Sequence, residues 1–332
     1  MKRREFIALV GGAAFAWPLP ARAQQPTRLR RIGVLIGFAE TDPDVQSWFA
    51  AFRDALAKLG WTEGSNLRIE LRWAGYDPDR MKTFAKELVD LRPDAILCQT
   101  TAVTGALARE TRTIPIVFAV VSDPIGSGFA TSLAHPGGNI TGFTTNEPSL
   151  GGKWMELLKE IAPLTVRVAL LFNPATAVAP QLFISSIQAA ASSSAVQASA
   201  APFHAADEIE GIIAVQARDP GGGLIVMPDA FFFSVPHRDL VITLAARYGV
   251  PTIYFDLLCV GSGGLIAYSA DFAEELRQAA GYIDRILKGE RTADLPIQLP
   301  TKYELAINVK TAKALGLTVP QKLLFTADEI IE

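Results

Sequence analysis

Short apolar runs alternate with amphipathic runs along most of this chain. The apolar run 31–37 (RIGVLIG) is followed by 45–59, in which hydrophobic residues recur every three to four positions. The same alternation begins again after residue 142. Strands that alternate with helices in this way are typical of βαβ units, which build parallel sheets. The pattern therefore predicts an α/β protein with two Rossmann-like lobes, each built on a parallel sheet.

Local signals mark where several helices begin. Asp42 and Asp77 each precede a proline, so a carboxylate acceptor is followed by the residue that best suits the first helical position. Asp271 and Glu274 have the spacing of a capping box. The predicted strands are 31–37, 66–73, 94–98 and 114–121 before residue 142, and 166–172, 196–203, 223–227, 252–255 and 264–269 after it.

Turn residues suggest where the chain passes between the lobes. Pro136-Gly137-Gly138 forms a turn before a short extended segment, which we interpret as the first hinge strand. Glycines and prolines place a second crossing near 261–266 and a third near 294–300. We therefore expect a first lobe of 30–140 plus 266–295 and a second lobe of 141–265 plus 296–332, joined by a three-crossing hinge.

The first 23 residues have the layout of an export signal. Three basic residues at 2–4 precede the apolar stretch 6–19, and Ala21-Arg22-Ala23 supplies small residues for cleavage after Ala23. The apolar stretch is shorter than the ~20 residues of a membrane-spanning helix. Arg3-Arg4 fits a twin-arginine signal, but Sec signals also carry two arginines, so the export route stays open. We expect residues 1–23 to be a signal peptide and the protein to be periplasmic.

The composition and charge of the chain limit the classes of partner that it could bind. Hydrophobic residues make up 49% and charged residues 20% of the 332 residues, as in ordinary globular proteins. The formal net charge of −3 becomes −6 once the four cations and Glu5 of the signal are removed, and no basic cluster remains to suggest nucleic acid. Cys98 and Cys259 lie in apolar runs, which favours two buried, unpaired thiols, although an exported protein could also pair them.

Catalytic and metal-binding motifs are scarce. His135, His204 and His237 are scattered and have no metal-ligand spacing. The chain has neither a G-x-S-x-G elbow nor a Walker loop, and Gly126-Ser127-Gly128 lacks the rest of a dinucleotide fingerprint, so we interpret it as a turn. No pairing of a nucleophile with a base is visible in the sequence. We therefore expect no enzymatic activity, no cofactor and no metal.

Polar loops follow several predicted strands, at the edge where open α/β sheets bind ligands. Helices that begin at Thr101 and after Asp123 offer unpaired N–H groups, which suit a ligand carboxylate. Aspartates at this edge suit an ammonium group, and aromatic rings suit an apolar one. The structural alternatives are helix caps for the aspartates and core packing for the rings. The predicted ligand-binding residues are Phe38, Glu40, Gln99, Thr100, Thr101, Ser122, Asp123, Asp229, Phe231, Tyr254 and Asp256.

Several longer motifs resemble a known family. They are 113–118 (TIPIVF), 136–142 (PGGNITG), 300–305 (PTKYEL), 308–317 (NVKTAKALGL) and 327–332 (ADEIIE). Together they resemble the ABC transporter substrate-binding proteins that include tryptophan- and tyrosine-binding members. The resemblance implies a type I periplasmic-binding-protein fold and delivery of ligand to an ABC permease in the inner membrane. Two segments depart from the family pattern near the expected cleft, namely 257–262 and Cys98-Gln99.

The sequence thus predicts an exported solute-binding protein of an ABC importer. We expect it to be a monomer that closes by hinge motion around an amino acid or another small carboxylate, with aromatic ligands included. Two alternatives remain. One is a ligand-binding sensor subunit that feeds a membrane receptor, and the other is an exported enzyme on the same fold.

Overall fold

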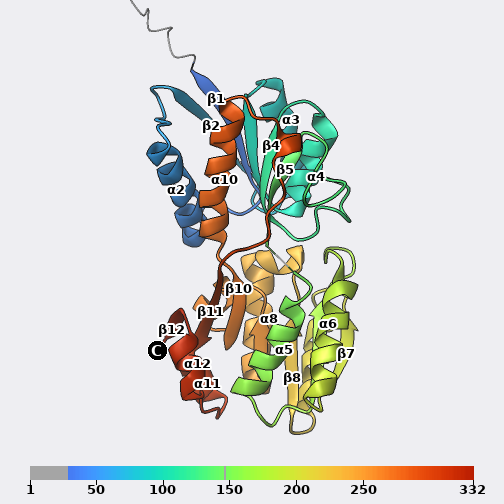
Figure 1. The fold of residues 1–332 in the computed structure, drawn as a ribbon. Coiled ribbons are helices and arrows are strands. Elements are labelled where there is room, and N and C mark those ends of the chain that lie inside the picture. The colour runs from blue at the N-terminus through green and yellow to red at the C-terminus, as the bar shows by residue number, and fades with distance from the viewer. Residues whose placement is uncertain (1–28, 146) are drawn as a thin grey trace, which may run out of the picture.

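The computed structural model describes residues 29–145 and 147–332, so the predicted signal peptide 1–23 lies outside the described residues. Two α/β lobes lie one above the other (Figure 1). The first is built on a five-stranded sheet of order β2-β1-β3-β4-β5, and the second on a seven-stranded sheet of order β12-β11-β10-β9-β8-β6-β7. All strand pairs of the first sheet are parallel, and so are those of the second except β10 with β11. The predicted fold class is confirmed.

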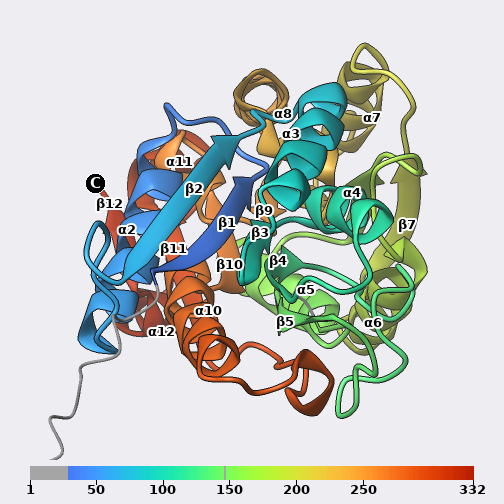
Figure 2. The same ribbon diagram turned by 90° about the horizontal axis from the view of Figure 1, so that it is seen from above.

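The first lobe is made from two separate stretches of chain. In order along the chain, its elements are β1 (Arg30–Ile36), α2 (Pro43–Lys58), β2 (Leu67–Trp73), α3 (Pro78–Asp90), β3 (Ala95–Gln99), α4 (Thr101–Glu110), β4 (Ile116–Val121), β5 (Ile140–Thr144), α10 (Phe272–Leu287) and η2 (Thr292–Asp294). Seen from above, α2 and α10 lie on one side of its sheet and α3 and α4 on the other (Figure 2).

The second lobe holds the remaining elements. They are α5 (Leu150–Ile161), β6 (Arg167–Phe172), α6 (Pro180–Ser193), β7 (Gln197–Pro202), α7 (Glu208–Ala217), β8 (Gly222–Val226), η1 (Ala230–Phe233), α8 (Val235–Tyr248), β9 (Thr252–Tyr254), α9 (Leu258–Gly261), β10 (Ile266–Ala270), β11 (Tyr303–Asn308), α11 (Val309–Ala314), α12 (Gln321–Thr326) and β12 (Glu329–Ile331).

Three of the predicted helix starts form as expected, whereas residues 124–128 form turns in place of the helix expected after Asp123. Asp42 accepts the N–H groups of Asp44 and Val45, Asp77 caps α3 in the same way, and Asp271 accepts the N–H of Glu274 at 2.9 Å. Each cap satisfies backbone donors that have no partner inside the helix. The local sequence therefore fixes the first turns of α2, α3 and α10.

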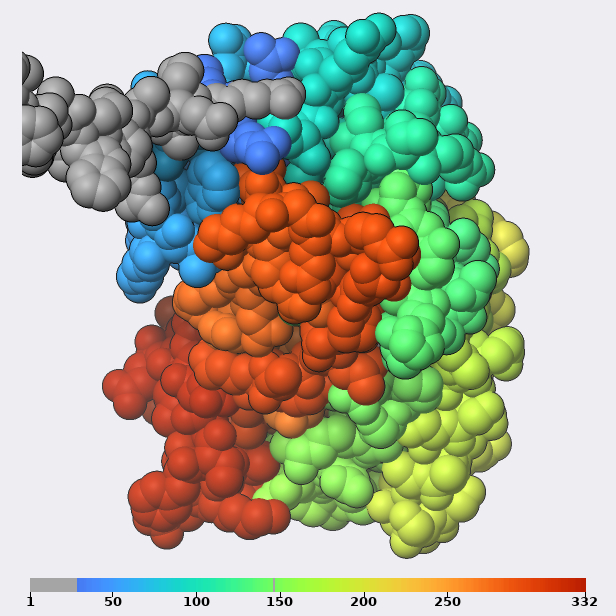
Figure 3. All heavy atoms as spheres, turned by 45° about the horizontal axis from the view of Figure 1, so that its top comes forward, coloured from blue at the N-terminus to red at the C-terminus, as the bar shows by residue number. Residues whose placement is uncertain are grey.

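Apolar faces of the helices close each core. Phe272, Leu276 and Ile283 of α10 share one buried cluster with Phe49 and Phe52 of α2. In the space-filling view the orange segment that includes α10 fills the face between the blue α2 region and the green loops before residue 145 (Figure 3). The first lobe thus depends on a helix that the chain supplies after most of the second lobe.

In the second lobe, Trp154 of α5 is almost fully buried. Its indole N–H donates to the backbone carbonyl of Tyr268 in β10 at 2.8 Å. The bond ties a helix on one face of the second sheet to the strand that leads into the hinge. Buried Trp side chains need such a partner for the N–H, because the indole nitrogen cannot be left unpaired without cost.

The chain crosses between the lobes three times, as predicted, but the boundaries differ from the prediction. Residues 141–144 were expected in the second lobe, yet β5 pairs with β4 of the first sheet. Residues 266–270 were expected in the first lobe, yet β10 lies between β9 and β11 of the second sheet. Strand pairing is a contact between distant residues, so turn residues alone do not indicate which sheet a strand joins.

The third boundary also shifts. Residues 296–298 were expected in the second lobe, but the N–H of Gln298 donates to the carbonyl of Gly142 at 2.9 Å, and that of Ile297 donates to Leu133. The first crossing therefore follows Thr145, and the other two are at 270–272 and at 299–302. Lys302 joins two of them, because its carbonyl accepts the N–H of Asp271 and its ammonium contacts the Asp271 carboxylate at 2.9 Å.

The two cysteines are buried and unpaired. Cys98 lies in the first sheet and Cys259 in α9 of the second lobe. Both thiols pack as small hydrophobic groups, and burial raises the pKa of the Cys98 thiol to about 12.

Candidate functional site

A cleft of about 790 Å³ is lined by residues of both lobes. It lies where the carboxyl ends of the two sets of strands face each other, between the two lobes of the ribbon in Figure 1. Its first-lobe wall comes from the loops after β1, β2, β3 and β4, and its second-lobe wall from the loops after β6, β8 and β9. Phe272, the first residue of α10, also lines it. The volume suits one small organic molecule, since ligand pockets commonly hold ~300–1,000 Å³.

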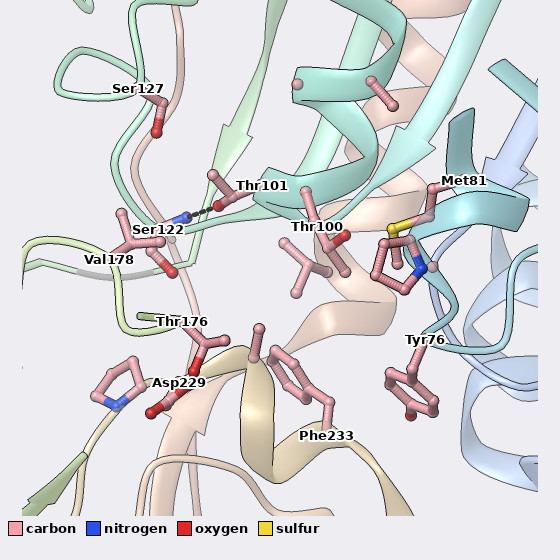
Figure 4. Close-up of a pocket in the computed structure, with 18 of the residues that line it drawn as sticks. Tyr76, Met81, Thr100, Thr101, Ser122, Ser127, Thr176, Val178, Asp229 and Phe233 are labelled. Carbon is pink, nitrogen blue, oxygen red and sulfur yellow. Dashed lines mark hydrogen bonds between the residues drawn. The ribbon is translucent and has the colours of Figure 1, made fainter. Parts of the chain in front are cut away.

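The start of α4 forms the centre of the first-lobe wall (Figure 4). Thr100 is its N-cap and accepts the N–H of Val103 at 3.4 Å. Gly37 lets Thr100 approach, because a Cβ at residue 37 would lie 2.9 Å from the Thr100 hydroxyl. The hydroxyl of Thr101 accepts the N–H of Ser122 from the neighbouring loop at 3.4 Å. The positive end of a helix therefore opens into the cleft between two threonine hydroxyls.

Backbone strain is concentrated at this wall. Six non-glycine residues in the described part of the chain have a positive φ, and three of them line the cleft. These three are Tyr76 (φ 65°), Thr100 (φ 77°) and Val120 (φ 56°). Left-handed backbone is costly for such side chains, above all for a β-branched valine, and it persists only where the surroundings hold it. Strained residues that gather in one cleft indicate a functional surface.

Asp229 organises the second-lobe wall. Its carboxylate accepts the N–H of Asn173 at 2.6 Å, the N–H of Phe231 at 2.9 Å and the hydroxyl of Thr176. The loop after β6 is thereby attached to the loop after β8. Burial raises the pKa of Asp229 although its three hydrogen bonds oppose the rise. Figure 4 shows Asp229 and Thr176 opposite Thr101 and Ser122, across the gap between the lobes.

Aromatic side chains supply much of the remaining surface. Phe231 stacks on the His237 imidazole, with ring centroids 3.8 Å apart and nearly parallel planes. Phe233 makes edge contacts with Phe255 of its own lobe and with Phe38 of the other lobe, at 5.5 and 5.1 Å. Rings arranged in this way offer flat apolar faces to a ligand.

The charges that line the cleft are mainly positive. Lys82, Arg109 and Arg112 are exposed at its first-lobe side. Among the lining residues that the structure describes, Asp229 is the one carboxylate, and it already accepts three hydrogen bonds. The balance of charge attracts an anionic group.

Five of the eleven predicted site residues line the cleft, and six do not. The structure brings together Thr100, Thr101, Ser122, Asp229 and Phe231. Of the others, Asp123 and Asp256 accept the N–H groups of Gly126 and Leu258, so each shapes its own turn. Glu40 is exposed on the loop after β1. Gln99 and Tyr254 are buried in the lobe interiors, and Phe38 is buried where it packs against Phe233 of the other lobe.

Several lining residues went unpredicted. Tyr76 and Thr176 stand in loops at the carboxyl ends of predicted strands, so the same rule would have found them. Phe233 neighbours the predicted Phe231. Arg109 and His237 lie inside helices, where nothing in the local sequence points to a cleft.

Within residues 29–145 and 147–332, no cluster of three or more His, Cys, Asp or Glu side chains has the arrangement of a metal site. Over the same residues, the structure contains no helix with the length and apolar character needed to span a bilayer.

Comparison with known proteins decides the family. The model of the family "ABC transporter substrate binding protein" matches residues 37–331, almost the whole described chain. The chain belongs to this family. A tyrosine-binding protein of Clostridioides difficile (strain R20291) is 26% identical over 296 residues, which cover 87% of this chain and 80% of the relative. The predicted family and the role as an ABC-type substrate-binding protein are confirmed.

Solved structures agree on the fold of this family member. A Streptococcus pneumonia ABC domain in complex with L-Trp superposes with a TM-score of 0.80 at 24% identity, covering 91% of this chain and 99% of that one. A conserved domain protein of Vibrio cholerae has a TM-score of 0.80 at 25% identity, over 91% and 100% of the two chains. A ligand-free, open substrate-binding protein of Clostridium difficile has a TM-score of 0.72 at 22% identity, over 91% and 99%.

Proposed function

We propose that this substrate-binding protein takes up an aromatic amino acid or a related aromatic carboxylate in the inter-lobe cleft and delivers it to the permease of an ABC importer. One observation carries the proposal. A positive helix end with two threonine hydroxyls faces a group of aromatic rings across a cleft of about 790 Å³. The tyrosine-binding relative and the L-Trp complex of a structural neighbour support the same class of ligand.

The ligand carboxylate fits best at the start of α4. The first N–H groups of a helix have no partner within it, and the hydroxyls of Thr100 and Thr101 add donors there. Arg109 and Arg112 draw anions towards the cleft from its rim. Asp229 lies on the opposite wall, where its carboxylate suits the ammonium group of an amino acid. The ring of the ligand then lies among Phe231 and the other aromatic side chains.

We also propose that the protein catalyses no reaction. The sequence suggested no nucleophile–base pair, but the cleft does contain a hydrogen bond of 2.8 Å between the Ser234 hydroxyl and His237 Nδ1. The same nitrogen lies 3.2 Å from the Phe231 carbonyl. In the tautomer with a protonated Nδ1 that donates to this carbonyl, the nitrogen has no lone pair to accept the serine proton, and Ser234 is not activated. The pair instead holds the start of α8 against η1.

The proposal extends to location and assembly. Members of this family act outside the cytoplasm, and the predicted signal peptide 1–23 would export this chain to the periplasm. Both walls of the cleft come from one chain, so a monomer is sufficient for binding. Light scattering of the purified protein tests the monomer directly.

Thermal unfolding of the protein with a ligand panel tests the function. A ligand at ~100 times its Kd stabilises the folded state by about 2.7 kcal/mol. For a protein of this size that corresponds to a rise in Tm of about 4 °C. We expect this rise with L-tryptophan, L-tyrosine or 3-(indol-3-yl)propionate, and no rise with glucose or L-lysine. Stabilisation by sugars alone would contradict the proposal.

A hydroxyl deletion tests where the carboxylate binds. Thr101→Val keeps the shape of the side chain but removes a donor at the start of α4, and we expect it to weaken binding about tenfold. Thr113→Val is the matched control, because residue 113 is exposed beyond the far end of the same helix. Equal affinities of the two variants, measured by calorimetry with the ligand found in the panel, would place the carboxylate elsewhere.

A further inference from the structure

The floor of the cleft contains a residue in an unfavourable conformation. Val120 lines the cleft with φ 56°, and the pairing of β4 with β5 shifts register between Phe118 and Val121. This irregularity turns the end of β4 so that both Val120 and Ser122 face the cleft. A β-branched residue does not adopt left-handed backbone unless a neighbouring group stabilises it.

The stabilising group is a buried glutamate from a distant part of the chain. Glu275 lies in the first turn of α10 and is 4% exposed. One of its carboxylate oxygens, Oε2, accepts the N–H of Val120 at 3.0 Å, across 155 residues of sequence. Burial raises the pKa of Glu275 well above its usual range, and the Val120 N–H opposes the rise. Burying a carboxyl group costs free energy of folding. Its presence at this site therefore indicates that the hydrogen bond to Val120 has a role.

A second buried polar side chain lies on the same face of the sheet. Gln99 is 1% exposed, and neither atom of its amide has a hydrogen-bond partner within the described residues. Side chains alternate along β3: Leu97 belongs to the cluster that contains α10, whereas Cys98 packs with α4. Gln99 therefore faces α10, as Glu275 faces the sheet. Both lie beneath the floor rather than in the cleft.

Glu275 also borders the hinge. A water-sized gap beside it is lined by Phe143, Asp271 and the third crossing at 299–302. Phe272, three residues earlier, lines the cleft itself. The first turn of α10 thus contacts the cleft, the strained strand and the crossings at once.

We propose that Glu275 is a positioning residue for ligand binding, which holds the left-handed Val120 and so sets where Val120 and Ser122 stand in the cleft. Its effect on affinity rests on the proposed function, whereas its effect on the Val120 backbone does not. An apolar side chain of similar size would fill the space but would leave the Val120 N–H without an acceptor. The strand would then relax towards ordinary pairing and withdraw both residues from the ligand.

Three variants test this role. Glu275→Leu removes the acceptor, whereas Glu275→Gln keeps an oxygen that can accept the Val120 N–H. Glu274→Leu is the control: Glu274 lies on the same turn of α10, but its carboxylate contacts the exposed Arg277. The probe is L-tryptophan, titrated by calorimetry. We expect Glu275→Leu to raise Kd about tenfold and the other two variants to stay within about twofold of the wild type.

A ligand-independent measurement separates this inference from the proposed function. Hydrogen exchange and the amide chemical shift of Val120 report the bond directly, and we expect Glu275→Leu alone among the three variants to lose protection there. Glycine adopts left-handed backbone at no steric cost, so Val120→Gly should reduce the effect of Glu275→Leu on unfolding.

An unchanged Val120 amide in Glu275→Leu, or effects on unfolding that simply add in the double variant, would overturn the positioning role. If the wild-type protein fails to bind L-tryptophan, the proposed ligand is wrong, while the Val120 amide and the double variant still decide the role of Glu275.

Discussion

Asp256 gives a pH dependence that can be worked out from the structure. Its carboxyl group is 3% exposed in the second lobe, and burial raises its pKa to about 6, against opposing contributions from the Leu258 N–H and Arg238. Asp42 and Asp44 of the first lobe add to the rise. A folded chain whose carboxyl has a raised pKa binds more protons than the unfolded chain between pH 4 and 6. The free energy of unfolding therefore falls as the pH rises through this range.

The size of the effect follows from the two pKa values. The interval from the ordinary 3.8 to about 6 corresponds to about 3 kcal/mol. Asp256→Asn removes the titration but keeps an oxygen that can accept the Leu258 N–H. The free energy of unfolding of this variant should therefore not fall as Asp256 ionises. The unfolded carboxyl is already partly ionised at pH 4, so we expect the variant to gain about 2.5 kcal/mol relative to the wild type between pH 4 and pH 7.

Urea unfolding at pH 4, 5, 6 and 7, followed by circular dichroism and tryptophan fluorescence, measures this difference. Asp271→Asn is the matched control, because this carboxyl titrates below the measured range. Burial raises the pKa of Asp271, but the Lys302 ammonium and the Glu274 N–H outweigh it and hold the pKa below its usual value. Because the pKa of Asp271 lies at or below 3.8 in both the folded and the unfolded chain, the difference in stability between Asp271→Asn and the wild type should stay nearly constant from pH 5 to pH 7. A difference between Asp256→Asn and the wild type that stays constant with pH would refute the reasoning.

Three further predictions concern other parts of the molecule. Asp229→Ala leaves three donors without their acceptor, so we expect a loss of about 2–4 kcal/mol in unfolding and weaker ligand binding; unaltered urea midpoints would contradict this. Gly142 has φ 152°, and Gly142→Ala would place a Cβ against the Phe118 carbonyl oxygen. Calorimetry should show a loss of about 3 kcal/mol or more in the free energy of unfolding, whereas an unchanged Tm would argue against this geometry. Trp61→Phe removes the 2.8 Å bond from the indole to Asp284 and should cost about 1.5 kcal/mol in urea unfolding; a stabilised variant would show that the bond contributes nothing.

Local signals in the sequence predicted most of the fold. Asp42, Asp77 and Asp271 begin helices because a carboxylate meets unpaired N–H groups within three residues, and that interaction needs no tertiary contact. The apolar run 257–260, which contains Cys259, could not be assigned from its sequence. It forms the short helix α9, which begins beside Asp256, whose carboxylate accepts the Leu258 N–H. Strand and helix cannot be told apart in so short a run.

The candidate site was only partly predictable, because the edge of a sheet is known from the sequence but the direction of each side chain is not. Thr100 lines the cleft while its neighbour Gln99 lies beneath the floor. Phe231 and Phe233 line it, whereas Phe232 between them is buried in the second lobe. Lining residues on helices, such as His237, depend on how two distant lobes face each other.

The divided first lobe has a consequence for biosynthesis. Its sheet is completed by β5 at Thr144, but α10, which covers one face of that sheet, ends only at Leu287. A nascent chain must therefore keep the apolar face that awaits α10 uncovered while more than 100 further residues are made, which takes about 10 seconds or longer at ordinary synthesis rates. During this interval the half-built lobe is a target for chaperones that bind exposed apolar strands. The second lobe can assemble its central strands first, so the native order of folding should run against the order of the sequence.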